Sequence, residues 1–269
     1  HRFIIADFSA IEARIIAYLS DEKWRIDVFN THGKIYEASA SKMFKVDINE
    51  ITKESELRQK GKIAELALGY QGGVKALVSM GAYNMNLCES ELIEIVRAFR
   101  SSNTNIVKLW NTVEKAFIEA VNNKSIVHID KNISFIYEGN ILFIKLPSGR
   151  RLSYIRPKID YNNAFNKSII TYEGVDSTTK KNTRLTTYGG KLVENIVQAI
   201  ARDVLGEAMM NLRNKGFNIV MHVHDEIVLE VENGVSSVEK VCEIMCKENR
   251  YLKGLNLRAD GFESNYYKK

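Results

Sequence analysis

The sequence is poor in the residues that break or cross-link a chain, with two prolines and three cysteines among 269 residues. Cys88, Cys242 and Cys246 are odd in number and include no CxxC pair, which excludes a disulfide-stapled mini-protein and predicts free thiols in a reducing compartment. The longest apolar runs, such as residues 219–223, fall far short of the ~20 residues that cross a bilayer, and no signal peptide opens the chain. These absences predict a soluble protein that is not secreted and has no membrane partner.

The composition is that of an ordinary globular protein, with 45% hydrophobic and 26% charged residues. The length allows one large or two small domains with a buried core. Lys and Arg number 38 against 33 Asp and Glu, and this net charge of +5 favours polyanionic partners only weakly. The chain opens with His1 and runs at once into the apolar residues 3–6, so we expect a piece of a longer protein.

The periodicity changes along the chain from helical to extended. Residues 34–123 show helical spacing almost throughout, whereas a period of two begins at Ile126 and predicts a hairpin around the turn at residues 147–149. The other predicted elements are a strand over residues 2–6, helices over 9–19, 191–215 and 235–249, and two apolar strands over 217–223 and 226–231.

Residues 148–191 carry nine Lys or Arg against three Asp or Glu. Aromatic side chains are interleaved with these cations, a composition that suits phosphate backbones. A solvated, loop-rich surface would have the same composition. The aromatic residues are Tyr154, Tyr161, Phe165, Tyr172 and Tyr188.

Two aspartates lie where predicted strands end. Asp7 follows the first strand and Asp225 occupies the tip between the two late apolar strands. Each has a plain alternative, because Asp7 or Ser9 could cap the following helix and Asp225 could belong to an ordinary turn. Aspartates from two sheet edges can also bridge two Mg²⁺ ions ~3.5–4 Å apart for in-line phosphoryl transfer.

A second set of candidate binding residues is spaced four residues apart on the predicted helix 54–70. Arg58, Lys62, Leu66 and Tyr70 form one slowly turning stripe, since each step drifts by about 40°. The Arg fork and the Lys charge could clamp a triphosphate, and Tyr70 could stack on a base. An ordinary solvated helix face is the alternative.

These residues carry a resemblance. DFSAIEARIIAYLS from Asp7, RQKGKIAELALGY from Arg58 and HVHDEIVLE from His222 resemble motifs A, B and C of family A DNA polymerases, in that order. LPSGRRLSY and KLVENIVQAIARD also look like elements of this family. The resemblance covers essentially the whole chain and is closest to phage or prophage members.

The resemblance implies metal-binding and nucleotide-binding residues. Asp7, Asp225 and the carbonyl of Phe8 would hold two Mg²⁺ ions, for which Mn²⁺ could substitute, and Glu226 would be an accessory acid. Glu12 would be the steric gate against a ribose 2′-hydroxyl, held near Tyr70. The residues implied to contact the incoming dNTP are Arg58, Lys62, Leu66, Tyr70 and His32, with Lys62 also donating a proton to pyrophosphate.

Contacts with primer–template DNA are implied for His224, Gln198, Arg150 and Arg151.

Three positions depart from the common family pattern. Leu66 stands where many relatives carry Phe or Tyr, Gln71 where Gly is common, and Glu194 where Asn is frequent. Gln71 moves the expected hinge after motif B one residue on, to Gly72.

The implied fold is an α+β right-hand palm, an antiparallel sheet with inserted helical fingers. Residues 1–31 and 124–269 would form the palm and residues 32–123 the fingers. The thumb and exonuclease domain, which the family places before motif A, would be absent from this sequence and belong to an upstream portion of a parent chain. The implied place of action is the cytoplasm of a bacterial cell or a phage-infected host.

The implied reaction is template-directed DNA synthesis from dNTPs. Without a thumb, the fragment could instead bind DNA or nucleotide without turnover. A metal-dependent phosphodiesterase would use the same aspartates but has no evident use for the motif B stripe. A single-subunit RNA polymerase shares the layout, yet Glu12 and the His-Asp-Glu tip favour DNA.

Overall fold

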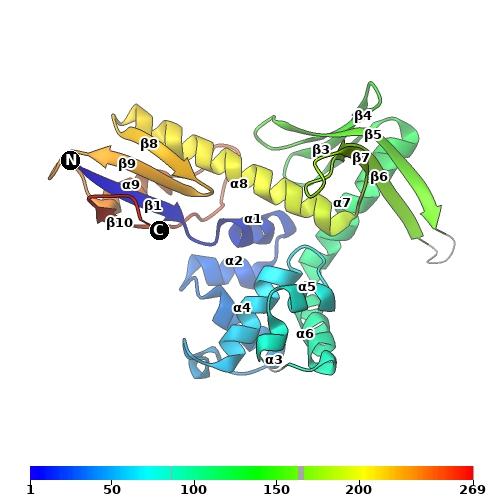
Figure 1. The fold of residues 1–269 in the computed structure, drawn as a ribbon, viewed down its shortest axis with the longest axis horizontal. Helices are drawn as coiled ribbons and strands as arrows, with labels where there is room; N and C mark the ends of the chain where they lie inside the picture. Colours follow the sequence, from blue (N-terminus) through cyan, green and yellow to red (C-terminus); the bar gives the residue numbers. More distant parts are fainter. Residues whose placement is uncertain (86, 163–166, 269) are drawn as a thin grey trace. The chain divides into compact units, whose positions relative to one another are not determined.

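The computed structural model describes residues 1–85, 87–162 and 167–268, so Phe165 of the basic segment lies outside the described residues. The chain divides into two compact units (Figure 1). Unit 1 comprises His1–Ile16 and Val197–Lys269, and unit 2 is Ala17–Ile196. The boundaries fall inside helices α1 (Ile11–Ser20) and α8 (Gly189–Asn214). None of the helices among the described residues is long and apolar enough to cross a membrane.

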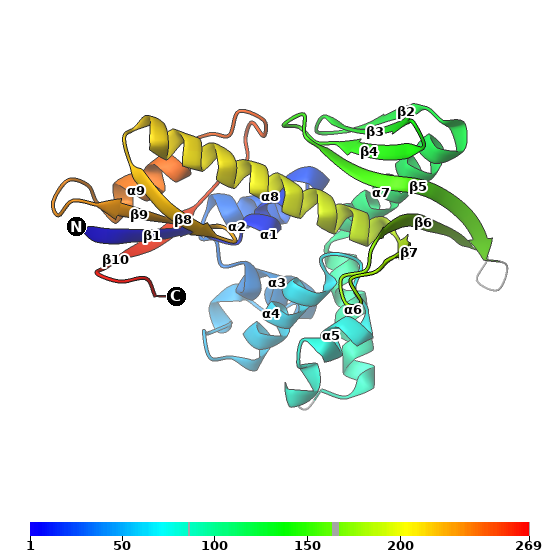
Figure 2. The ribbon, with the colours of Figure 1, turned by 45° about the horizontal axis from the view of Figure 1, so that its top comes forward.

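Unit 1 is built on a four-stranded antiparallel sheet in the order β10-β1-β9-β8. Helix α9 (Val238–Met245) packs on β1 and β10, and Figure 2 shows α9 on one side of this sheet. The predicted first strand and the apolar hairpin are confirmed. Helix α9 is shorter than expected at both ends, because Ser237 caps its start and Cys246 its end. The strands are β1 (Arg2–Phe8), β8 (Asn218–Val223), β9 (Glu226–Val231) and β10 (Ala259–Ser264).

Unit 2 contains the helical block. The described residues between 34 and 123 form helices and turns but no strand, as predicted. Helix α2 was not predicted, because the charged and apolar residues of its short sequence show little helical periodicity. The elements are α2 (Lys23–Asn30), α3 (Ile35–Phe44), η1 (Ile48–Glu50), α4 (Glu56–Leu68), α5 (Val74–Ser79), η2 (Ala82–Met85), α6 (Glu89–Ser102) and α7 (Thr104–Asn123).

A six-stranded sheet follows, in which each strand pairs antiparallel with the next in the chain. The predicted hairpin is confirmed, with Lys145 opposite Arg151. The basic segment after it is mostly strand rather than loop. Helix α7 packs on this sheet, where Phe117 meets the Tyr154 ring edge to face at 5.3 Å. The strands are β2 (Ile126–Ile129), β3 (Ile133–Glu138), β4 (Ile141–Lys145), β5 (Arg151–Asn162), β6 (Lys167–Val175) and β7 (Asn182–Thr187).

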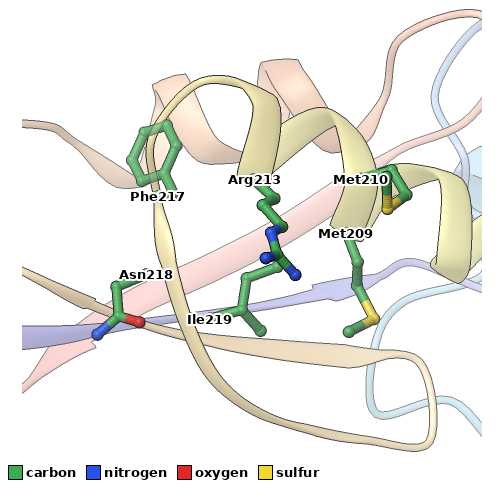
Figure 3. Close-up of a pocket in the computed structure, with 6 residues that line it drawn as sticks. All are labelled: Met209, Met210, Arg213, Phe217, Asn218 and Ile219. Atoms are coloured by element: carbon green, nitrogen blue, oxygen red, sulfur yellow. The ribbon is translucent and has the colours of Figure 1, made fainter.

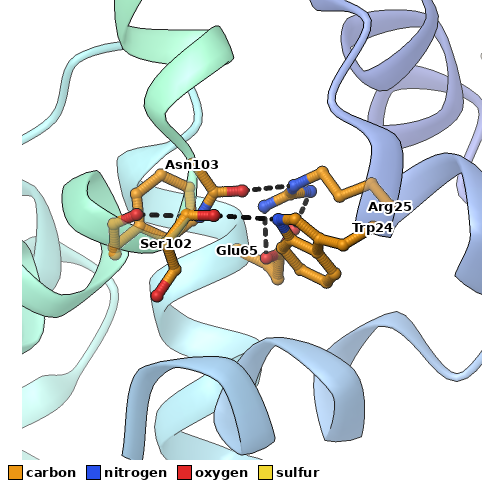
Figure 4. Close-up of polar contacts among 6 residues, drawn as sticks. Trp24, Arg25, Glu65, Ser102 and Asn103 are labelled. Atoms are coloured by element: carbon orange, nitrogen blue, oxygen red, sulfur yellow. Dashed lines mark hydrogen bonds and ion pairs between the residues drawn. The ribbon is translucent and has the colours of Figure 1, made fainter.

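A buried ion pair joins the helices of unit 2 (Figure 4). Arg25 on α2 donates from both terminal nitrogens to the Glu65 carboxylate on α4, at 2.8 and 2.6 Å, and its Nε donates to Asn103 Oδ1 at 2.6 Å. The neighbouring Trp24 indole donates to the Ser102 carbonyl at 2.9 Å. The side chains of Arg25 and Glu65 are only 2% and 6% exposed, so the fork-to-fork pair is shielded from water.

This pair also fixes the rotation of α4. Arg58 precedes Glu65 by seven residues, which at ~100° per residue places both on nearly the same side of the helix. Lys62 and Leu66 are turned toward solvent, and Leu66 is 50% exposed. The stripe predicted from the sequence therefore begins beside the buried pair and turns outward.

Arg25→Ala should lower the melting temperature by roughly 6–20 °C, because removing one partner of a buried pair costs about 3–5 kcal/mol. The measurement is thermal unfolding followed by circular dichroism. Lys23→Ala, on the same helix, is the matched control: its pair with Asp21 is exposed and should contribute less than about 1 kcal/mol. Equal melting temperatures for the two variants would contradict a structural role for the buried pair.

Candidate functional site

Three predicted acids of unit 1 converge at one end of its sheet. In the register of the strands, Asp7 of β1 lies opposite Glu226 of β9. Asp225 directly precedes β9, and its carbonyl accepts the Phe8 amide at 3.4 Å. On the other side of β1, Asp7 lies opposite Asp260 of β10. Asp7 is thus flanked by carboxylates on both neighbouring strands.

The electrostatics of this acidic cluster disfavour a negative charge on Asp7. Partial burial raises the pKa of Asp7, and the carboxylates of Asp225, Glu226 and Asp260 raise it further. Glu226 itself is buried, and its Oε1 atom has no hydrogen-bond partner. A bound cation would reduce the repulsion among these carboxylates and would give the Glu226 Oε1 atom a partner.

The helix-capping alternative for Asp7 and Ser9 is wrong. Asp7 lies inside strand β1, and α1 begins only at Ile11, so the residue at the cap position is Ala10. The Ser9 hydroxyl donates instead to the carboxylate of Asp260. The carboxylate of Asp7 is therefore not used to begin the helix.

Asp260 is the one member of the acidic cluster that sequence reasoning missed. It lies in the polar tail of the chain, where neither a motif nor an apolar alternation marks a strand. Only the pairing of β10 with β1, across most of the chain length, brings it beside Asp7. Arg258 approaches the other oxygen of Asp260 at 3.4 Å.

In unit 2, the start of the α4 stripe is held by an ion pair. Arg58 Nε donates to Glu37 Oε1 at 2.7 Å, and its guanidinium lies 5.5 Å from the centre of the Tyr36 ring. Lys62 is exposed one turn later. The exposed His32 follows α2, and its Nδ1 accepts the Lys34 amide at 3.0 Å.

The chain turns sharply at the end of α4. The left-handed backbone conformation falls on Gln71, with φ of 67°, and the hinge expected at Gly72 stays a prediction. The Gln71 side-chain oxygen accepts the amide of Gly190, the second residue of α8, at 2.8 Å. Glu12 lies in unit 1 and Tyr70 in unit 2, so their predicted proximity stays a prediction.

The predicted DNA contacts lie on the surfaces of both units. Gln198 is exposed on α8, and His224 is exposed at the β8–β9 turn with φ of 53°. Arg150 is exposed before β5. The Arg151 guanidinium pairs with Glu138 at 3.1 Å. Their roles toward DNA stay predictions.

A pocket of about 470 Å³ in unit 1 lies between the end of α8 and the start of β8 (Figure 3). Its lining is mainly apolar and contains none of the predicted site residues. The lining residues are Met209, Met210, Arg213, Phe217, Asn218 and Ile219.

With the acidic cluster and the helical block established, the sequence model of DNA polymerase family A was found to match residues 1–260. The chain belongs to DNA polymerase family A. The DNA polymerase of Bacillus phage SP02 is 56% identical over 269 residues, which are 100% of this chain and 41% of that protein. DNA polymerase I of Borreliella burgdorferi is 27% identical over 266 residues, covering 96% of this chain and 24% of that protein.

The family A chain therefore spans less than half the length of these relatives. A solved structure described as the POL domain of Pol1 from M. smegmatis, in complex with DNA primer-template and dNTP, matches with a TM-score of 0.65. The match covers 98% of this chain and 40% of that one, at 21% sequence identity. The predicted α+β fold with antiparallel sheets is confirmed.

Asp7→Asn should raise the melting temperature at pH 7 by a few degrees. Since the folded-state pKa of Asp7 is raised, its ionised form destabilises the fold at every pH above that pKa. The penalty shrinks as the pH falls through the raised pKa and disappears below the ordinary value, where the wild-type carboxyl is protonated in both folded and unfolded chains.

Melting curves at pH 7 and at about pH 3 provide the test, without divalent cations. The control is Asp27→Asn, which changes an exposed acid of α2 outside the acidic cluster and should be close to neutral. If the melting temperatures of Asp7→Asn and wild type differ as much at pH 3 as at pH 7, carboxylate repulsion is not the cause of the difference.

Proposed function

We propose that this chain carries out template-directed DNA synthesis, in which a primer 3′-hydroxyl attacks the α-phosphate of a dNTP and pyrophosphate leaves. The observation that carries the proposal is the convergence of Asp7, Asp225 and Glu226 at one sheet end in a member of DNA polymerase family A. The related M. smegmatis domain was solved with DNA primer-template and dNTP, which supports the same class of substrates here.

The donor set fits two Mg²⁺ ions, for which Mn²⁺ could substitute. The described part of the chain contains no group of three or more His, Cys, Asp or Glu side chains that could hold a metal. Mg²⁺ is usually held by one or two carboxylates together with substrate phosphates, and on that basis Asp7, Asp225 and the Phe8 carbonyl are the proposed protein ligands. When bound, the two metals lower the pKa of the 3′-hydroxyl and stabilise the charge of the transferring phosphoryl group.

The stripe of α4 that runs from the half-buried Arg58 to the exposed Lys62 and Leu66 is proposed to bind the triphosphate. Arg58 is oriented by Glu37 through its Nε, and Lys62 is exposed one turn later, where it can reach a phosphate and donate a proton to pyrophosphate. Leu66 and Tyr70 continue this surface toward the base. Among the other predicted contacts, His32 completes the phosphate site and Glu12 excludes the ribose 2′-hydroxyl.

Primer–template DNA is proposed to contact His224, Gln198, Arg150 and Arg151. We assign residues 1–31 and 124–269 to the palm and residues 32–123 to the fingers. A thumb and an exonuclease domain would belong to an upstream portion of a longer parent chain. The greater length of the relatives supports such a parent chain. The phage relative supports the cytoplasm of a bacterial host as the place of action.

Binding without turnover is the second candidate function. It is favoured by one observation, that the chain spans only 41% of its Bacillus phage relative. A fragment that lacks part of the duplex grip would bind primer–template DNA with a steep salt dependence but would not extend it.

Asp225→Ala should abolish extension of a labelled hairpin primer at low salt with Mg²⁺ and dNTPs, because it removes a proposed metal ligand. The matched control, Asp130→Ala, removes an exposed acid in the turn between β2 and β3 and should extend normally. Extension that survives in Asp225→Ala would contradict the metal assignment. DNA binding without extension, in wild type and variants alike, would favour the second candidate function.

Glu12→Ala should raise ribonucleotide incorporation relative to dNTP by about tenfold or more, since it opens space for a 2′-hydroxyl. The measurement is single-nucleotide extension with paired dNTP and rNTP. Glu89→Ala is the matched control, because Glu89 is an exposed acid in the first turn of another helix. If Glu12→Ala excludes ribonucleotides as wild type does, the steric gate lies elsewhere.

A further inference from the structure

The turn that ends α4 is closed by a hydrogen bond from a distant element. Gln71 adopts the left-handed backbone conformation that glycine adopts without strain. Its side-chain oxygen accepts the Gly190 amide at 2.8 Å, across 119 residues of sequence. This amide lies in the first turn of α8, where helices leave N–H groups without a partner in the helix.

Close backbone packing accompanies this bond. A Cβ atom at position 190 would overlap the Tyr70 carbonyl oxygen and the Gln71 Cβ, so the start of α8 lies directly on the Tyr70–Gln71 peptide. A Cβ at position 72 would overlap the Ala67 carbonyl oxygen. The Tyr70–Gln71 peptide is therefore packed against the start of α8, and the residue after it is packed against the last turn of α4.

Two further side chains hold the same turn. The Trp110 indole of α7 donates to the Gly69 carbonyl at 3.0 Å, and Arg100 of α6 donates to the Gly72 carbonyl at 3.2 Å. Together with Gln71, these bonds hold the backbone immediately before and after Tyr70. The contacts all lie within unit 2.

We propose that Gln71 is a positioning residue for Tyr70. Glycine could adopt the turn without strain, so the side chain at position 71 is explained by its bond to Gly190, which fixes the Tyr70–Gln71 peptide against α8. Which side-chain rotamers are allowed depends on the backbone, so fixing this peptide fixes the Cα–Cβ direction of Tyr70 and restricts the positions that its ring can take. The inference rests on the proposed function, in which Tyr70 lies against the incoming nucleotide.

The first test compares Gln71→Gly with Gln71→Glu. Gln71→Gly tolerates the left-handed turn but loses the bond, and it should raise the KM for dNTP roughly tenfold with an unchanged melting temperature. Gln71→Glu keeps an acceptor oxygen of the same reach beside a helix N-terminus, which favours an anion, and should keep KM within about twofold of wild type. Asn122→Ala removes an exposed amide side chain of α7, away from the proposed nucleotide site, and is the matched control.

A wild-type KM for Gln71→Gly would overturn the proposal. If the melting temperature also fell, Gln71 would have a structural role alone. Hydrogen exchange supplies a readout independent of activity. The Gly190 amide should exchange faster in Gln71→Gly and at the wild-type rate in Gln71→Glu. Unchanged exchange in Gln71→Gly would mean that the bond does not hold the turn.

Tyr70→Ala separates this proposal from the proposed function. If Tyr70→Ala leaves both the KM for dNTP and the exclusion of ribonucleotides unchanged, the nucleotide assignment of Tyr70 fails. If Tyr70→Ala changes them while Gln71→Gly changes nothing, only the role of Gln71 fails. Should the chain bind without turnover, the dissociation constant of dNTP on a dideoxy-terminated primer–template replaces KM in each comparison.

Discussion

The ion pair between Arg25 and Glu65 is the constraint on which the helical block of unit 2 depends. Two charges out of water must satisfy each other, and they do so only if α2 and α4 meet in one orientation. That orientation determines which residues of α4 are buried and which face solvent. The surface formed by Lys62 and Leu66 is therefore a consequence of a contact on another side of the helix.

In unit 1, charges of the same sign lie close together, whereas the buried pair of unit 2 joins opposite charges. Its acidic cluster places Asp7 among three carboxylates, and the resulting repulsion raises the pKa of Asp7. Burial of apolar side chains on β1 and β9 stabilises the sheet and offsets this repulsion. These side chains are Ile4, Ile5, Val228 and Leu229. The unfavourable charges lie at the end of the sheet, where a substrate could approach, and the apolar residues fill its interior.

Much of this arrangement could be predicted from the sequence, and the rest could not for identifiable reasons. The helical block, the hairpin around residues 147–149 and the proximity of Asp7 and Asp225 follow from periodicity and from motifs that place acids at strand ends. Asp260 could not be found, because strand pairing between the two ends of the chain leaves no local signal. The hydrogen bond between Gln71 and Gly190 could not be predicted for the same reason, because its partners lie 119 residues apart.

The sequence separation of these contacts sets the order in which we expect the chain to fold. Arg25 and Glu65 are 40 residues apart, whereas Gln71 and Gly190 are 119 apart, and closing the longer loop costs about 1 kcal/mol more in chain entropy. The helical block can thus assemble from its own residues while the later sheet is still being made on the ribosome. The turn beside Tyr70 stays incomplete until α8 emerges, so the proposed nucleotide site is among the last parts of unit 2 to mature.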